Sequence, residues 1–212
     1  IVLGSWFLIK KYKVLDKKLI KTAVVATDNV HLYQISNPDF DIFYGYKEGD
    51  QLRHLVKFQT KNSSLAMQLL NTNDKLQVSK KTSQINKEQT DIIRFTDIYP
   101  DTSVYYLLSK TRNKEVIRLE SLKSPAKFVY SVVSENLVRK DNSFGQFSIT
   151  SMYMEDANKV RSTDVVMDLV FVKKGDKGED EYTLTVTPDS AWLTDPARKF
   201  PVLLDPSINI VL

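Results

Sequence analysis

The spacing of apolar residues changes once along the chain, and this change limits what the chain can fold into. After residue 23 the period falls to two, and short alternating runs are separated by turn residues. Runs at this spacing, without helices of crossover length between them, predict antiparallel sheets. We therefore expect a mainly β fold, with an antiparallel β-sandwich-like domain or domains and an N-terminal helix. That helix is predicted by apolar residues at spacings of three and four, namely Leu8, Tyr12, Leu15, Leu19 and Ala23.

Turn residues mark the expected strand boundaries. A turn at Gly49 joins two alternating runs, residues 40–44 and 52–58, into an expected hairpin. Residues 182–187 alternate most cleanly, with apolar side chains on one face and threonines on the other. Residues 63–70 fit either a short helix or a strand. The other expected strands are residues 24–35 with a break at 28–29, 76–78, 92–95, 103–108, 115–119, 128–133, 146–151 and 164–173.

The polar run at residues 80–90 is predicted to be a solvated loop and the best internal boundary. It divides the chain into an N-terminal anchor or docking helix (residues 1–23), a first β subdomain (residues 24–90) and a second one (residues 91–212). Residues 174–181 are also charged. Their lysines interleave with the acids, which favours a solvated hairpin tip over a calcium loop.

The N-terminal run, residues 1–9, is almost entirely apolar and is followed by lysines. A membrane-spanning helix needs about 20 residues, so this run alone cannot cross a bilayer. It suits the end of a signal anchor, a helix packed on the protein's own core, or a strand added to a neighbouring subunit. The candidate anchor or assembly residues are Trp6, Phe7 and Leu8, with Ile208, Ile210 and Val211 of the apolar C-terminal run.

Composition excludes several kinds of site. The chain has no cysteine, which excludes disulfides, thiolate zinc sites and a cysteine nucleophile. Its two histidines, His31 and His54, lie in strand-like runs and are expected to be half-buried or at an edge. The 30 Lys and Arg against 26 Asp and Glu give +4, too little to indicate nucleic-acid binding without a cluster. No phosphate-binding loop, GxSxG or HExxH motif is present. We therefore expect no enzyme, no catalytic residue, no metal site and no cofactor.

The C-terminal segment PDSAWLTDPARKFPVLLDPSI carries a specific pattern. It resembles the region that bacterial Rhs/wall-associated surface proteins, and proteins with DNRLRE modules, place before their repeats. The resemblance extends over residues 95–208 and departs from the pattern at Asp101, where glycine is usual, and at Asn158. It implies an exported, non-catalytic β module at the cell surface. The matching residues of the terminal motif are Pro188, Asp189, Trp192, Leu193, Asp195, Pro196, Arg198, Pro201, Val202, Asp205 and Pro206.

The physical chemistry of this motif is structural. Trp192 and Leu193 supply apolar area for burial, and the three prolines after them favour extended backbone. Arg198 is placed to pair with Asp195 or Asp205. The prediction is a rigid, extended exit strand; a ligand groove built by Trp192 and Arg198 is the alternative. The residues of the predicted exit motif are Trp192, Leu193, Asp195, Pro196, Arg198, Pro201, Asp205 and Pro206.

These observations favour a non-catalytic bacterial cell-surface protein that serves wall association, adhesion or surface assembly. Its β domain would link an N-terminal anchor to further modules or subunits. The expected partners are other surface-protein modules, identical subunits, the membrane through the N-terminus and cell-wall glycan, with no nucleic acid. The expected localisation is exported, at the cell surface, and membrane- or wall-associated. The alternative is a carbohydrate-binding β-sandwich module with surface aromatics such as Tyr105, Tyr106, Tyr130 or Tyr153.

Overall fold

The computed structural model describes residues 24–26, 28–37, 39–85, 88–108, 112–205 and 207–210. The helix expected over residues 1–23, with Trp6, Phe7 and Leu8, lies outside the described residues, as do Pro206 and Val211. The described residues are mainly antiparallel β-strand, as predicted, with a short helix α1 (Ser190–Thr194). The strands are β1 (Val24–Val25), β2 (His31–Ser36), β3 (Asp41–Glu48), β4 (Gln51–Gln59), β5 (Ser64–Leu69), β6 (Gln77–Ile85), β7 (Glu88–Tyr99), β8 (Thr102–Leu108), β9 (Arg112–Leu119), β10 (Phe128–Glu135), β11 (Arg139–Lys140), β12 (Ser143–Phe144), β13 (Phe147–Ile149), β14 (Met154–Glu155), β15 (Arg161–Ser162), β16 (Val165–Lys174), β17 (Asp180–Pro188), β18 (Val202–Leu204) and β19 (Ser207–Ile210).

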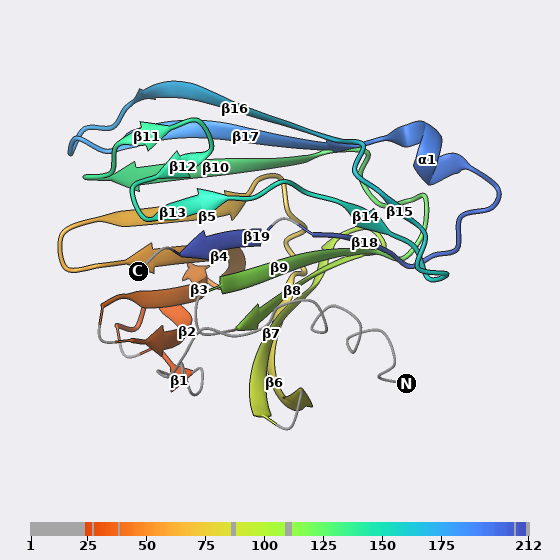
Figure 1. Ribbon diagram of the computed structural model, residues 1–212. Helices are drawn as coiled ribbons and strands as arrows, with labels where there is room; N and C mark the ends of the chain where they lie inside the picture. The colour runs from red at the N-terminus through yellow and green to blue at the C-terminus, as the bar shows by residue number, and fades with distance from the viewer. Residues whose placement is uncertain are drawn as a thin grey trace.

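Eight of the described strands form one antiparallel sheet in the order β1-β2-β3-β4-β5-β10-β17-β16. Figure 1 shows this sheet extending from β16 at the top of the view to β1 at the bottom. The predicted hairpin at Gly49 is β3–β4, and residues 174–181 form the tip of the β16–β17 hairpin. In β17 the apolar residues Tyr182, Leu184 and Val186 are buried, as the alternation predicts.

The other eleven described strands form the larger sheet, which is organised around β9. On one side, β9 pairs with β8, which leads to β7 and β6. On its other side, β18 pairs with residues 117–119 and β19 with residues 112–114. From there β18 continues to β14 and β15, and β19 continues to β13, β12 and β11. The C-terminal segment is therefore built into the sheet.

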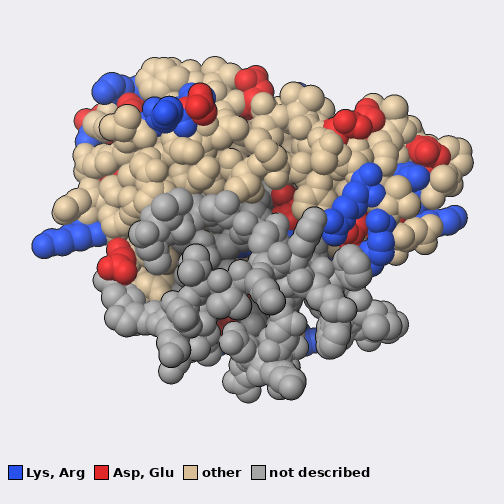
Figure 2. Space-filling model, in the orientation of Figure 1, with Lys and Arg blue, Asp and Glu red and all other residues tan. Residues whose placement is uncertain are grey.

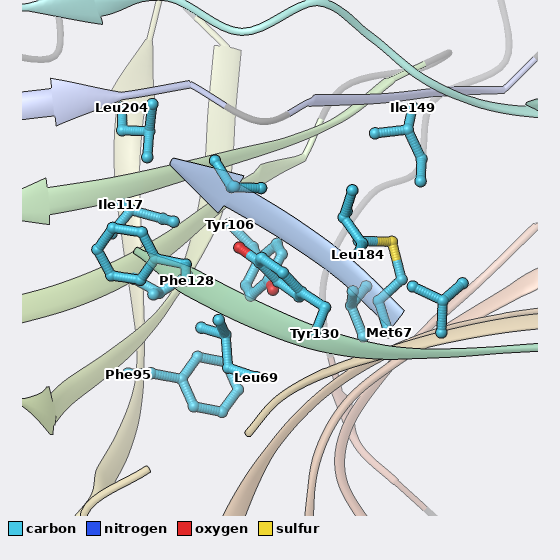
Figure 3. Close-up of a cluster of buried hydrophobic side chains, with 14 of the residues drawn as sticks. Met67, Leu69, Phe95, Tyr106, Ile117, Phe128, Tyr130, Ile149, Leu184 and Leu204 are labelled. Carbon is cyan, nitrogen blue, oxygen red and sulfur yellow. The ribbon is translucent and has the colours of Figure 1, made fainter. Parts of the chain in front are cut away.

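Both sheets contribute to a single hydrophobic core, part of which is shown in Figure 3. Aromatic rings from opposite sheets touch at several points. Tyr44 and Tyr106 have ring centroids 5.2 Å apart, and those of Phe58 and Phe147 are 5.3 Å apart. Such aromatic contacts hold the two sheets together through buried area and ring geometry.

The structure resolves one ambiguity of the sequence analysis and contradicts one of its predictions. Residues 63–70, ambiguous in sequence, contain strand β5. Residues 80–90, predicted as a loop, are instead part of the β6–β7 hairpin, so that prediction was wrong. The side chains of Lys80, Lys81 and Thr82 are exposed, so the strand lacks the apolar alternation that burial of one face would impose. The boundary expected at residue 90 falls within this hairpin, and β5 pairs directly with β10.

No helix with the length and apolar character needed to cross a bilayer occurs among the described residues.

Candidate functional site: a cation–aromatic face on the larger sheet

Helix α1 positions the C-terminal motif. Asp189 caps the helix, because its Oδ1 accepts a hydrogen bond from Ala191 N and its Oδ2 accepts one from Trp192 N, both at 3.1 Å. The single turn that follows places Leu193 in the core and Trp192 against its edge. Asp189 therefore determines where the Trp192 ring lies.

Arg198 connects this motif to the β14–β15 turn. Its guanidinium carbon lies 4.7 Å from the centroid of the Trp192 ring. Nη1 donates to Oδ2 of Asp156 at 3.3 Å, and Nη2 lies 3.8 Å from Oδ2 of Asp195. The structure thus brings Arg198 to Asp195, one of its two expected partners, and adds Asp156, which is distant in sequence. Trp192 and Arg198 are stacked on each other, so they do not form the two walls of a groove.

Asp205, the other expected partner of Arg198, pairs with Lys114 of β9. Lys114 Nζ donates to Asp205 Oδ2 at 2.6 Å, and both side chains are about nine-tenths buried. Tyr153 adjoins the pair: burial, and then the Asp205 carboxylate, raise the pKa of its hydroxyl. Strand β18 is thereby fixed to β9 at its C-terminal end.

The remaining parts of the predicted exit motif lie in loops and strands of the same chain. Pro196 is exposed in the loop after α1, and Pro201 immediately precedes β18. The segment predicted to leave as an exit strand is paired within the larger sheet as β18 and β19. The backbone of Ile208 and Ile210, expected at an assembly contact, pairs with β9 and β13 of the same chain. Pairing within the sheet satisfies the backbone N–H and C=O groups of this segment, so the segment is part of the fold and does not leave it.

Glu155 of β14 forms ion pairs with two cationic side chains. Its Oε1 accepts from Lys159 Nζ at 3.1 Å and its Oε2 from Arg161 Nε at 2.6 Å. The hydrogen bond that Arg161 donates to Glu155 raises the pKa of the Arg161 guanidinium. Arg161 also lies over the Tyr153 ring, with its guanidinium carbon 4.9 Å from the ring centroid.

The register of the larger sheet places a second cation–aromatic pair on the same face. Glu155 lies opposite both Arg161 and Leu203, Leu203 lies opposite Arg118, and Arg118 lies opposite Ser103. Directly opposed residues in antiparallel strands share a face, and so do alternate residues of one strand. Tyr105 is two residues from Ser103 and lies opposite Arg94, whose guanidinium carbon is 5.1 Å from the Tyr105 ring centroid.

We define the cation–aromatic face as Arg94, Tyr105, Arg118, Tyr153 and Arg161. Figure 2 shows Lys and Arg side chains gathered over the part of the fold where Figure 1 places β14 and β15. The carboxylate beneath them, Glu155, is 1% exposed, whereas the side chains of Lys159 and Arg161 are 39% and 42% exposed. The acid is inside and the cations are outside, so this part of the surface is positive. A positive surface with aromatic rings can bind anionic groups and stack planar ones.

A cluster of hydrogen-bonded polar side chains is buried in the core. His54 is fully buried: its Nδ1 accepts from Leu69 N at 3.0 Å, and its Nε2 lies 2.7 Å from Tyr106 Oη. Because Nδ1 is an acceptor, Nε2 carries the proton and donates to Tyr106. Burial lowers the pKa of His54 to about 3, so the ring is neutral. The sequence predicted a half-buried or edge histidine; the structure shows an interior one.

Burial also corrects the set of aromatic residues considered for carbohydrate binding. Tyr106 and Tyr130 are fully buried, and Figure 3 shows them among apolar side chains of the core. Tyr105 and Tyr153 are partly exposed and belong to the cation–aromatic face.

Within the described ranges, no group of three or more His, Cys, Asp and Glu side chains is placed to hold a metal ion.

Comparison with known proteins gives three related matches. The chain is 26% identical over 148 residues to the tRNA3(Ser)-specific nuclease WapA of Bacillus spizizenii, the tRNA nuclease WapA of Bacillus subtilis and the tRNA(Glu)-specific nuclease WapA of Bacillus subtilis subsp. natto. The matched residues make up 62% of this chain and 6% of the length of each relative. No family model matches the chain, and no solved structure matches it.

These relatives correct three expectations drawn from the sequence. We expected a non-catalytic structural or interaction protein, but all three relatives are named as nucleases. We expected no enzyme, and their names state an enzymatic activity. We expected surface proteins, subunits, membrane or glycan as partners and no nucleic acid, whereas the relatives are named for acting on tRNA. A net charge of +4 averages over the whole chain, so it does not reveal whether cations are grouped on one face.

Proposed function

We propose that this chain is a β-sandwich part of a protein that cleaves tRNA. The observation that carries the proposal is the 148-residue match to three proteins named as tRNA nucleases. The cation–aromatic face supports it, because a positive surface favours binding of a polyanion such as RNA. The two sheets around one core support the sandwich architecture.

The direct test is an RNA cleavage assay on the complete protein that contains this chain. The purified protein is incubated with end-labelled tRNA, and the products are separated on a denaturing gel. The proposal expects discrete tRNA fragments that accumulate with time at catalytic protein concentrations. Intact tRNA after prolonged incubation at equimolar protein would contradict it. The chain of 212 residues, assayed in parallel, shows whether it cleaves tRNA by itself.

We also propose that the protein is exported and that residues 95–208 share the architecture of the region before the repeats in Rhs/wall-associated and DNRLRE-module proteins. The support is the terminal motif, with Trp192, Asp195, Pro196 and Arg198 in the matching positions. Fractionation of the producing cells tests the first part, because an exported protein should appear in the wall or culture fraction. A protein confined to the cytosolic fraction would contradict it.

A further inference from the structure

We propose that the cation–aromatic face is an RNA-binding surface that holds backbone phosphates with its arginines and stacks bases on its guanidinium–tyrosine pairs. The inference rests on the proposed function, because tRNA in the names of the relatives suggests the class of ligand. It goes further by assigning the contact to residues of this chain.

The first argument is the distribution of charge with depth. The side chains of Arg118 and Arg161 are 34% and 42% exposed, whereas Glu155, which neutralises Arg161, is 1% exposed. Glu120 at one end of the face is an exposed acid, and it pairs with Arg118. Arg94 is exposed and forms no ion pair with the described residues. The cations therefore outnumber the acids in the layer that a ligand would touch, which complements a polyanion.

The second argument is the hydrogen-bonding capacity that the arginines retain. A guanidinium has five N–H donors in a planar fork that matches the oxygens of a phosphate. Among the described residues, Arg161 uses only Nε in a hydrogen bond, to Glu155. Arg118 gives Nε and Nη2 to Glu120 and keeps Nη1. Arg94 and Arg161 thus have the donors needed for a bidentate phosphate contact.

The third argument is the stacking geometry. Arg94 and Arg161 each lie over a tyrosine ring, at 5.1 Å and 4.9 Å from ring centroid to guanidinium carbon. The tyrosine ring lies on one side of each planar guanidinium, and a ligand would approach the opposite side. Unpaired RNA bases stack on tyrosine rings and on arginine planes. A base on the outer side of either arginine would extend the existing stack.

The fourth argument is the length of the face. Arg94 lies on β7 and Arg161 on β15, so the face extends over six adjacent strands, β7, β8, β9, β18, β14 and β15. With strands about 4.8 Å apart, the five intervals span about 24 Å. This distance accommodates several nucleotides of single-stranded RNA, such as a tRNA loop or end. The flat face of a sheet suits unpaired bases, which can lie against it.

The test measures equilibrium binding of a fluorescent single-stranded RNA to the 212-residue chain by anisotropy at several salt concentrations. The test variant is Arg94→Gln with Arg161→Gln, and Lys159 remains to pair with Glu155. The matched control is Lys173→Gln with Lys174→Gln, which removes two exposed, ion-paired lysines from β16 of the other sheet. Circular dichroism checks that each variant is folded. A third variant, Tyr105→Ala, tests the stacking.

We expect the arginine variant to bind at least about tenfold more weakly and the lysine control to stay within about twofold. The slope of log affinity against log salt should fall by about 1.4 in the arginine variant, as for two lost phosphate contacts on a single strand. Tyr105→Ala should weaken binding of RNA but not of inorganic polyphosphate, which has no bases. Equal losses in the arginine and lysine variants would overturn the proposal, as would equal effects of Tyr105→Ala on RNA and polyphosphate.

The outcome is separable from that of the proposed function. If the complete protein cleaves tRNA while the arginine variant binds RNA normally, this inference fails and the proposed function stands. If the chain binds RNA through the face but the complete protein leaves tRNA intact, the proposed function fails instead.

Discussion

In the core, Tyr130 Oη donates a 2.7 Å hydrogen bond to Oε1 of Glu115, and both residues are almost completely inaccessible to solvent. The carboxyl group lies between the sheets, with the Tyr130 hydroxyl as the hydrogen-bond partner of Oε1. Burial raises the pKa of Glu115 to about 7, against the opposing effect of hydrogen bonds from Tyr130 and Tyr106. Folding therefore shifts the titration of this interior carboxyl group into the neutral pH range.

Glu115→Gln should change how stability depends on pH. An ordinary glutamate has a pKa of 4.5, so between pH 4.5 and 7 the folded chain keeps a proton that the unfolded chain releases. Raising the pH through this window destabilises the folded state, by about 3 kcal/mol at pH 8. Urea unfolding at pH 5 and pH 8 should show this loss in the stability of the wild type relative to the variant, because His54 adds the same opposing pH dependence to both proteins. Glu120→Gln, at an exposed site, is the control, and equal pH dependence in all three proteins would contradict the assignment.

His54 should produce the opposite slope. Its pKa is about 3 when folded against 6.5 in the open chain, so below pH 6.5 the unfolded state takes up a proton that the folded state does not. Stability therefore falls as the pH drops from 6.5 toward 3. Between pH 4.5 and 6.5 the effects of His54 and Glu115 cancel. In Glu115→Gln, lowering the pH from 6.5 to 4.5 should cost about 2 kcal/mol more than in the wild type. An NMR titration of the His54 ring that showed protonation near pH 6 would refute this account.

The Lys114–Asp205 pair should be important for stability because it is buried. Lys114→Met leaves the Asp205 carboxylate without its lysine in a site where the side chain is 9% exposed. We expect a loss of about 3–5 kcal/mol in the free energy of unfolding. Lys114→Met with Asp205→Asn should lose clearly less than the sum of the single changes in a double-mutant cycle. The exposed pair Lys173–Glu181 is the control, and Lys173→Met should cost less than about 1 kcal/mol.

Gly45 and Gly49 offer a matched comparison of packing and backbone strain. Both have a φ of +61°, which disfavours any residue with a Cβ. A Cβ on Gly45 would lie 2.9 Å from Leu32 Cδ1 and 3.2 Å from Phe95 Cε1, whereas one on Gly49 would meet nothing within 4 Å. Gly49→Ala should therefore cost about 1 kcal/mol and Gly45→Ala at least about 1 kcal/mol more. Thermal unfolding of both variants measures the order, and equal losses would show that Leu32 and Phe95 move aside without cost.

The sequence predicts strands well where one face of the strand is buried and the other is exposed to solvent. Residues 182–187 alternate because β17 places Tyr182, Leu184 and Val186 in the core, and burial imposes this pattern directly. Residues 80–90 of the β6–β7 hairpin were wrongly predicted to be a loop, because no alternation marks them as strand. The hairpin's exposed residues Lys80 and Lys81 face water, so no apolar period was required of them.

The candidate site was less predictable because its contacts join distant segments. The Arg198–Asp156 and Lys114–Asp205 pairs connect residues 42 and 91 positions apart, and no local spacing indicates either pair. Only pairing of β9 with β18, and of β18 with β14, brings Arg118 and Arg161 to one face. The depth of Glu155, on which the positive surface depends, is likewise a property of the folded sheet. Residue types alone indicated single arginines and tyrosines, not their arrangement.

The central claim, that the chain belongs to a protein that cleaves tRNA, is tested most directly by sequencing RNA ends. Total RNA is incubated with the complete protein, and new 3′ ends are mapped against a sample without protein. The account predicts new ends concentrated in tRNA, with ribosomal RNA left largely intact. New ends spread over all RNA classes in proportion to their abundance, or no new ends, would contradict it.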